Sequence, residues 1–155
     1  MKEKLLISSC LLGIPCRYDG AAKAGKFGRE EKSLDEIVAR LTERYELVPF
    51  CPEIYGGLPT PRIPAERCGA RVLTREGVDV TAEYRRGAEA ARKLCQVLGI
   101  RRALLKAKSP ACGVGRIYDG THSATLTDGD GVCAEALLGD GLFVVNEDGV
   151  DLLLD

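Results

Sequence analysis

Histidine and long hydrophobic runs are both scarce in this sequence of 155 residues. Because His122 is the only histidine, a Cys–His nucleophilic pair or a histidine-rich zinc site would depend on that single residue. No apolar run approaches the roughly 20 residues that a membrane-spanning helix needs, and the apolar stretch near the N-terminus is too short for the core of a signal peptide. We therefore expect a cytoplasmic protein with no membrane partner.

An excess of one charge is absent as well. Lysine and arginine together number 22, and aspartate and glutamate 23, which gives a formal net charge of −1 at pH 7. Binding to a nucleic-acid backbone needs a basic face, so no nucleic-acid polymer is expected as a partner. With 45% hydrophobic and 29% charged residues the composition is that of a globular protein, and the length suits one domain over residues 1–155.

Cysteine, by contrast, is abundant: seven are present, although no two have the C-x-x-C spacing. An odd number of cysteines without a secretory signal argues against a framework of disulfides. Metal or cluster ligands, catalytic thiols and buried apolar side chains remain as alternatives. Since spacing alone is a weak metal signal here, the position of each cysteine relative to the predicted strands becomes the more useful evidence.

Strand and helix patterns alternate along the chain. Short apolar runs predict strands at residues 4–9, 46–50, 103–106 and 142–146. Helical spacing and capping signals predict a helix that begins at Ser33 in a capping box with Glu36, a long helix that Thr81 caps and Gly99 ends, and a short helix over residues 131–141. This repeated βαβ pattern predicts a single-domain, three-layer, Rossmann-like α/β fold, with a mostly parallel sheet and helices on both faces.

The segments between these elements are rich in glycine and proline. Residues 11–32, 51–65 and 109–123 are predicted to be loops, the second of them without regular structure. Residues 70–73 and 78–80 are predicted to pair as a small hairpin. The acidic tail at residues 147–155 is either an edge strand or frayed.

Three cysteines follow predicted strands. Cys10 and Cys51 come directly after the first and second strands, and Cys112 lies six residues after the third. Ligands of open parallel sheets bind outside the carboxyl ends of the strands, so these three thiols are predicted to share one edge. Three thiols can bind a metal and leave one coordination position open, which is the catalytic rather than the structural arrangement.

The remaining four cysteines give weaker signals. Cys95 lies on the apolar face of the long helix and is predicted to be a buried structural thiol, and Cys133 is interpreted in the same way. Cys68 is ambiguous. Cys16 follows Cys10 by six residues at the same edge, where it is a fourth ligand, a resolving thiol or a loop thiol without a role.

Motifs spread over nearly the whole chain carry a family resemblance. In order along the chain they are Ser9-Cys10-Leu11-Leu12-Gly13, Arg17-Tyr18-Asp19-Gly20, Cys51-Pro52-Glu53, Gly56-Gly57-Leu58-Pro59-Thr60-Pro61-Arg62, Asp79-Val80-Thr81, Gly87-Ala88, Lys106, Ser109-Pro110-Ala111-Cys112-Gly113 and Ile117-Tyr118-Asp119-Gly120-Thr121. With these motifs the chain resembles the family catalogued as domain of unknown function 523, some of whose members are iron–sulfur-dependent thiouracil desulfidases.

The resemblance implies a 4Fe–4S cluster held by three cysteines, which match Cys10, Cys51 and Cys112. It does not make Cys16 a ligand, and His122 stands where relatives often have an aromatic residue. The implied activity is a desulfidase that replaces C=S by C=O in a thiolated pyrimidine base or nucleotide, without net redox change. The implied partner is therefore a small-molecule thiobase or thionucleotide.

Polar residues near these cysteines supply candidates for the chemistry. Glu53 is the first candidate for the base that activates water, and Ser109 for a residue that orients water or substrate. Candidate substrate-binding residues are Arg17, Tyr18, Arg62 and Lys108. The alternatives are a Glu53–Arg62 salt bridge, a Ser109–Pro110 turn, a loop-packing role for Tyr18 and loop-bracing charges that include Asp19.

Three functions from other classes use the same residues. A zinc-binding or cluster-storing module without turnover would need only the three strand-end thiols. A thiol-redox protein would use Cys10 and Cys16, although the missing C-x-x-C spacing counts against it. In a small-ligand-binding module the cysteines would be incidental. In protein handled in air, we expect the cluster to be lost. Either another metal then takes the site, or Cys10 and Cys112 form a disulfide.

Overall fold

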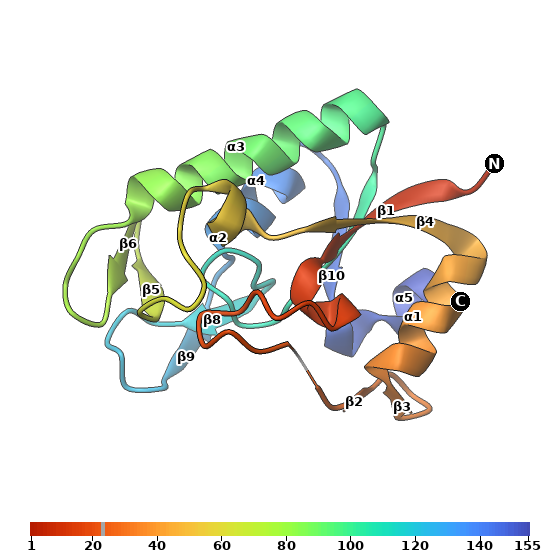
Figure 1. Cartoon of the computed structure of the whole chain (residues 1–155), viewed down its shortest axis with the longest axis horizontal. Coiled ribbons are helices and arrows are strands. Elements are labelled where there is room, and N and C mark those ends of the chain that lie inside the picture. The colour runs from red at the N-terminus through yellow and green to blue at the C-terminus, as the bar shows by residue number, and fades with distance from the viewer. Residues whose placement is uncertain (23) are drawn as a thin grey trace.

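A parallel four-stranded sheet forms the centre of the protein (Figure 1). The computed structural model describes residues 1–22 and 24–155. The strand order is β10–β7–β1–β4, and every neighbouring pair is parallel. The strands are β1 (Glu3–Ser8), β4 (Tyr45–Phe50), β7 (Arg102–Leu105) and β10 (Phe143–Asn146). The four predicted strands and the parallel sheet are therefore confirmed.

Helices cover both faces of this sheet. On one face α1 (Leu34–Arg44) and α5 (Asp151–Leu154) pack on Leu5 and Ile7 of β1. On the other face α3 (Thr81–Leu98) and α4 (Val132–Gly139) pack on Leu6. Alternate side chains of a strand point to opposite faces, so β1 contributes to both cores at once. The predicted three-layer α/β architecture is confirmed. No helix within residues 1–22 or 24–155 has the length and apolarity needed to cross a membrane.

The helix boundaries follow from local capping chemistry. The Ser33 hydroxyl accepts a hydrogen bond from the Glu36 N–H at 3.3 Å, as predicted. Gly99 ends α3 in the left-handed conformation, with φ of 68°. The prediction that Thr81 caps α3 is wrong. Asp79 accepts from the Thr81 N–H at 2.9 Å instead, while the Thr81 hydroxyl accepts from the Val72 N–H at 2.8 Å and so ties α3 to β6 (Arg71–Thr74).

The predicted pairing of residues 70–73 with residues 78–80 is present: Leu73 and Asp79 form an antiparallel bridge, and the Val80 N–H donates to the Val72 carbonyl at 2.9 Å. On its other side β6 pairs with β5 (Ala65–Cys68), a strand that was not predicted. The prediction for the C-terminal tail is wrong. The C-terminal tail is neither an edge strand nor frayed, because it forms η2 (Glu147–Gly149) and α5 and buries Leu153 completely. A lone apolar run cannot distinguish a strand from a helical turn, which explains the error in the C-terminal tail.

Short elements also occur inside the predicted loops. Residues 51–65 contain the helical turn α2 (Pro52–Tyr55), so the expectation of no regular structure there is wrong. The other elements in these segments are η1 (Ser9–Leu12), β2 (Lys26–Phe27), β3 (Lys32–Ser33), β8 (Arg116–Tyr118) and β9 (Leu126–Asp128). In Figure 1 the α2 turn and the β5–β6 and β8–β9 hairpins lie on the side to which the carboxyl ends of the central strands point.

Two glycines let α2 pack directly on α3. A Cβ on Gly87 would lie 2.0 Å from the carbonyl oxygen of Pro52, and a Cβ on Gly56 would lie 2.0 Å from that of Glu83. Real Cβ atoms do not approach backbone oxygens so closely, so any side chain at either position would push the two helices apart. The position of α2, and of the residues on it, thus depends on the absence of two methyl groups.

We expect Gly87→Ala to lower the free energy of unfolding by about 1–3 kcal/mol, because the new methyl group overpacks a contact between two backbones. Urea denaturation measures the change. Gly139→Ala is the matched control, since a Cβ at Gly139, the last residue of α4, has no neighbour within 4 Å. There the same substitution should leave stability unchanged or slightly raised. Equal stability of the two variants would contradict the proposed contact.

Candidate active site

One cavity at the carboxyl edge of the sheet collects the three strand-end thiols. Cys10 lies on η1 directly after β1, Cys51 lies between β4 and α2, and Cys112 lies in the segment that follows β7. All three line a cavity of about 500 Å³ and are buried. The structure therefore brings together the cysteines that were selected by strand position, while their role as metal ligands stays a prediction.

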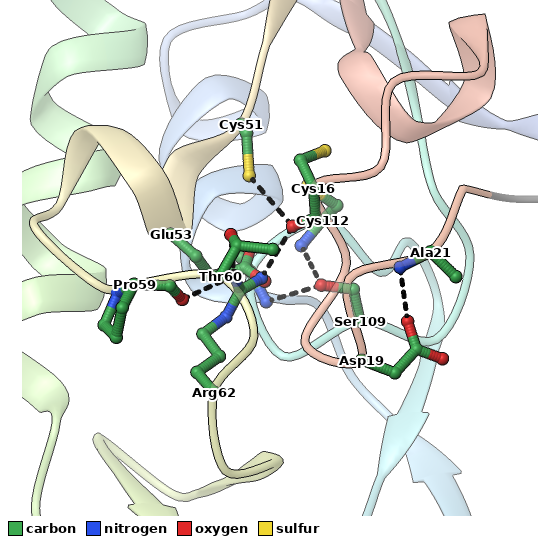
Figure 2. A network of polar contacts seen from close by, with 11 residues as sticks. Cys16, Asp19, Ala21, Cys51, Glu53, Pro59, Thr60, Arg62, Ser109 and Cys112 are labelled. Atoms are coloured by element: carbon green, nitrogen blue, oxygen red, sulfur yellow. Dashed lines mark hydrogen bonds and ion pairs between the residues drawn. The ribbon is translucent and has the colours of Figure 1, made fainter.

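Cys16 is a fourth thiol in the same cavity. Gly13, with φ of 89°, turns the chain back after η1, so that Cys16 is buried beside Cys10 and Cys51. The Cys51 thiol donates to the Cys16 carbonyl oxygen at 3.9 Å (Figure 2). The sequence signal that could have placed Cys16 here was the glycine between two cysteines of one short loop.

Burial and mutual contact raise the pKa values of Cys16, Cys51 and Cys112. Hydrogen bonding with Cys10, and then burial, raise the pKa of Cys16 to about 11, although a hydrogen bond with Cys51 opposes the shift. Hydrogen bonding with Cys16, followed by burial, raises the pKa of Cys51, and burial is the main cause that raises that of Cys112.

The cavity offers cysteine thiols as potential metal ligands. Thiolate ligands suit the iron of an iron–sulfur cluster better than a hard cation. A single zinc ion needs its sulfur ligands about 2.3 Å from one point. Across the described residues no three Cys, His, Asp or Glu side chains form such a compact group. In an iron–sulfur cluster each thiolate binds a different iron, so the sulfurs surround the group without converging on one point. Thiols distributed around a cavity are compatible with that arrangement.

Glu53 and Arg62 form a nearly buried ion pair beside these thiols. The Arg62 guanidinium donates to the Glu53 carboxylate at 2.6 Å, and the two side chains are 6% and 14% exposed respectively. Burial opposes the Arg62 charge, but the Glu53 carboxylate outweighs that effect and raises the pKa of Arg62. The salt bridge considered as an alternative from the sequence is present.

The other guanidinium hydrogen bonds of Arg62 go to neighbouring loops. They reach the Cys16 carbonyl at 3.2 Å, and the Pro59 carbonyl and Thr60 hydroxyl at 3.1 Å (Figure 2). Arg62 thus joins the segment that carries Cys16 to the segment that carries Glu53. These bonds support a bracing role, and its predicted contact with a substrate stays a prediction.

Ser109 organises the segment that carries Cys112. Its hydroxyl oxygen accepts hydrogen bonds from the Ala111 and Cys112 N–H groups, each at 3.1 Å. Gly131 packs against the same segment, since a Cβ there would lie 2.4 Å from the Ala111 carbonyl carbon. The turn role weighed as the alternative for Ser109 is therefore present, and its role toward water or substrate stays a prediction.

The remaining predicted substrate-binding residues line the same cavity. Lys108 is exposed there, with a backbone φ of 70°, and Arg17 and Tyr18 follow Cys16. The Tyr18 side chain is exposed, while its backbone carbonyl accepts from the Arg62 backbone N–H at 2.7 Å. Asp19 accepts from the Ala21 N–H at 2.9 Å, which is the loop-bracing role weighed for it (Figure 2).

Sequence reasoning missed two features of this cavity. Tyr84, on the covering helix α3, also lines the cavity. Its burial, and to a smaller extent the nearby Glu53 carboxylate, raise the pKa of its hydroxyl. Glu66 accepts from the Gly120 and His122 N–H groups at 3.0 and 3.1 Å, with its second oxygen 3.7 Å from His122 Nδ1. No local motif marks either residue, because both reach the cavity through tertiary packing.

The other cysteines lie outside the cavity. Cys95 of α3 and Cys133 of α4 are buried in the core between the helices and the sheet, as expected. Burial raises the pKa of Cys95 to about 11 and is also the main cause of the raised pKa of Cys133. Cys68 ends β5 and is exposed.

A parallel α/β sheet with a thiol-lined cavity at its carboxyl edge defines a candidate metal-dependent enzyme. The chain belongs to the 2-thiouracil desulfurase family, which it matches over residues 5–149. It is similar to a solved structure described as the [4Fe-4S]-dependent thiouracil desulfidase TudS, with 49% identity, a TM-score of 0.85, and coverage of 98% of this chain and 95% of that one. It is also 36% identical to the uncharacterized protein YbbK of Bacillus subtilis (strain 168), over 97% of this chain and 99% of YbbK. The predicted family resemblance is thereby confirmed.

Proposed function

We propose that the protein is a thiouracil desulfidase that converts C=S to C=O in a thiolated pyrimidine base or nucleotide. The observation that carries the proposal is the gathering of Cys10, Cys51 and Cys112 around one cavity that also holds Glu53. Membership of the family and the 49% identity to TudS support it. The reaction balances as a thiocarbonyl plus water giving a carbonyl plus hydrogen sulfide, so no electron donor or acceptor is needed.

Cys10, Cys51 and Cys112 are the residues that we propose to hold a 4Fe–4S cluster. When bound on three cysteines, such a cluster supplies one iron without a protein ligand, which is a Lewis acid with affinity for soft sulfur. The protein backbone fixes two of these thiols: α2 holds Cys51 through its packing on α3, and the Ser109 turn holds Cys112.

The chain's own side chains have three proposed tasks. Glu53 accepts a proton from the attacking water, and Arg62 orients the Glu53 carboxylate through their ion pair. Ser109 positions Cys112 and contacts water or substrate. Arg17, Tyr18 and Lys108 line the cavity and would contact the base or a phosphate attached to it. Because seven free thiols suit a reducing compartment, we place this single-domain protein in the cytoplasm.

Anaerobic reconstitution with iron and sulfide is expected to give a protein with broad visible absorption that releases sulfide from thiouracil. Uracil and sulfide should appear in equal amounts, because water supplies the only new atom on the base. The measurement is sulfide assay and chromatography of the base under oxygen-free conditions. A folded protein that takes up negligible iron under these conditions would contradict the cluster, and one that is fully loaded but inactive on both thiobases and thionucleotides would contradict the reaction.

A non-catalytic metal-binding module is the second candidate. The observation that favours it is the Glu53–Arg62 ion pair, since a carboxylate engaged in bracing two loops needs no catalytic role. This candidate predicts iron or zinc binding without sulfide release. The same reconstitution experiment separates the two functions.

A further inference from the structure

Cys16 is the cavity thiol to which the proposed function gives no task. It is 5% exposed and lines the same cavity as Cys10 and Cys51, and its backbone carbonyl lies 3.9 Å from the Cys51 sulfur. Its carbonyl oxygen accepts from both the Cys51 thiol and Arg62, which holds the residue against the loop that carries Cys51. A residue with only a loop-filling role would not need to lie between two proposed ligands.

We propose that Cys16 is a resolving thiol, which forms a reversible disulfide with Cys10 or Cys51 when the metal-free site meets a peroxide. Hydrogen peroxide first converts one of the two neighbouring thiols to a sulfenic acid and releases water. The Cys16 sulfur then attacks the sulfenic sulfur, the S–O bond breaks, and a second water leaves as the disulfide forms. One peroxide is reduced and two thiols are oxidised, so the electrons balance. A thiol reductant converts the disulfide back to two thiols, whereas it does not reduce a sulfinic acid.

The geometry distinguishes Cys16 from the other thiols. Cys112 lines the same cavity, but its thiol hydrogen-bonds Ser8, whereas Cys16 lies against the Cys51 thiol through its own carbonyl. Cys95 of α3 and Cys133 of α4 lie in the core between these helices and the sheet. For this reason we infer pairing through Cys16 instead of the Cys10–Cys112 disulfide expected from the sequence. The benefit of this disulfide, which is to preserve the ligands for a new cluster, rests on the proposed function. The formation of the disulfide does not.

The test uses the full chain, freed of metal by a chelator under reducing conditions, in a Cys68→Ser background so that the exposed thiol cannot cross-link molecules. The protein, shown to be folded by circular dichroism, is treated with hydrogen peroxide, alkylated and digested without reduction for mass mapping. We expect two thiols to be lost, a cross-linked peptide pair that contains Cys16, and full recovery of both thiols after dithiothreitol. Cys112→Ser should behave in the same way.

Cys16→Ser provides the contrast. In this variant we expect Cys10 or Cys51 to proceed to sulfinic acid, with no thiol recovered by dithiothreitol and a matching loss of iron uptake on later reconstitution. The proposal is overturned if Cys16 in the parent protein remains fully alkylated after its neighbours have been oxidised, which can be read even if the variant fails to fold. Normal iron binding and sulfide release by unoxidised Cys16→Ser protein would support the proposed function, whether or not the mass mapping finds a disulfide that contains Cys16.

Discussion

Replacing Cys51 by serine is expected to abolish iron binding, whereas replacing Cys95 by alanine is expected to leave the iron content unchanged. The reason lies in their positions, since Cys51 lines the cavity at the carboxyl end of β4, while Cys95 is buried in the core on α3. A serine oxygen is a much poorer ligand for iron in a cluster than a thiolate sulfur. Anaerobic reconstitution followed by iron and sulfide assays measures the difference.

The comparison has two built-in controls. Both variants remove a buried thiol, so a general effect of losing a cysteine from the interior would appear in both, and thermal unfolding shows whether each is folded. Cys10→Ser and Cys112→Ser should resemble Cys51→Ser. Equal iron contents in folded Cys51→Ser and Cys95→Ala proteins would refute the ligand assignment.

The second large effect is expected for Glu53→Gln, which should retain the iron but lower kcat by about 10²–10⁴-fold, the range typical for a positioned base. Glutamine keeps the size of the side chain and its ability to accept a hydrogen bond from Arg62, but it does not accept a proton from water. KM should change little, because the shape of the cavity is preserved. The measurement is sulfide release from a thiouracil or thiouridine nucleotide at equal iron content.

The ion pair makes a matched control essential. Arg62→Lys keeps the cation next to Glu53 but removes the planar group that bonds the Cys16 and Pro59 carbonyls. If Glu53 only braces the two loops, the two variants should lose turnover and thermal stability in parallel. If Glu53 is the base, Glu53→Gln should lose far more turnover at similar stability. Glu66→Gln, a carboxyl-to-amide change elsewhere in the same cavity, should have a much smaller effect.

A lost cluster in Glu53→Gln would assign Glu53 to the support of the Cys51 loop. The base would then be sought elsewhere, with Ser109 acting through a water as the next candidate. An unchanged rate with unchanged iron content would make Glu53 purely structural.

The sequence predicted the central sheet because each strand was a continuous apolar run and each long helix had both a periodic face and an end signal. Ser33 and Gly99, for instance, act at helix ends through contacts within a few residues, which sequence reasoning can follow. Strand position also sufficed to select Cys10, Cys51 and Cys112, since parallel strands all end at the same edge.

What the sequence could not predict depends on contacts between distant segments. β5 pairs with β6 in addition to the predicted pairing of β6 with residues 78–80, and nothing in the β5 segment alone specifies that strand. Cys16 was left with three alternatives because its burial depends on Arg62, 46 residues away. Glu66 and His122 meet across two hairpins and have no spacing that a motif could describe.

The separation of the three strand-end thiols along the chain has a consequence for biogenesis. Cys10 and Cys51 emerge from the ribosome well before Cys112, and the site is complete only after β7 has paired with β1 and the Ser109 turn has formed. On the proposed ligand assignment, a chain that ends before Cys112 lacks one ligand, so we expect loading with iron and sulfur to follow folding rather than to direct it. A cofactor that binds only the folded protein stabilises it. The loaded protein should therefore resist unfolding more strongly than the newly made chain.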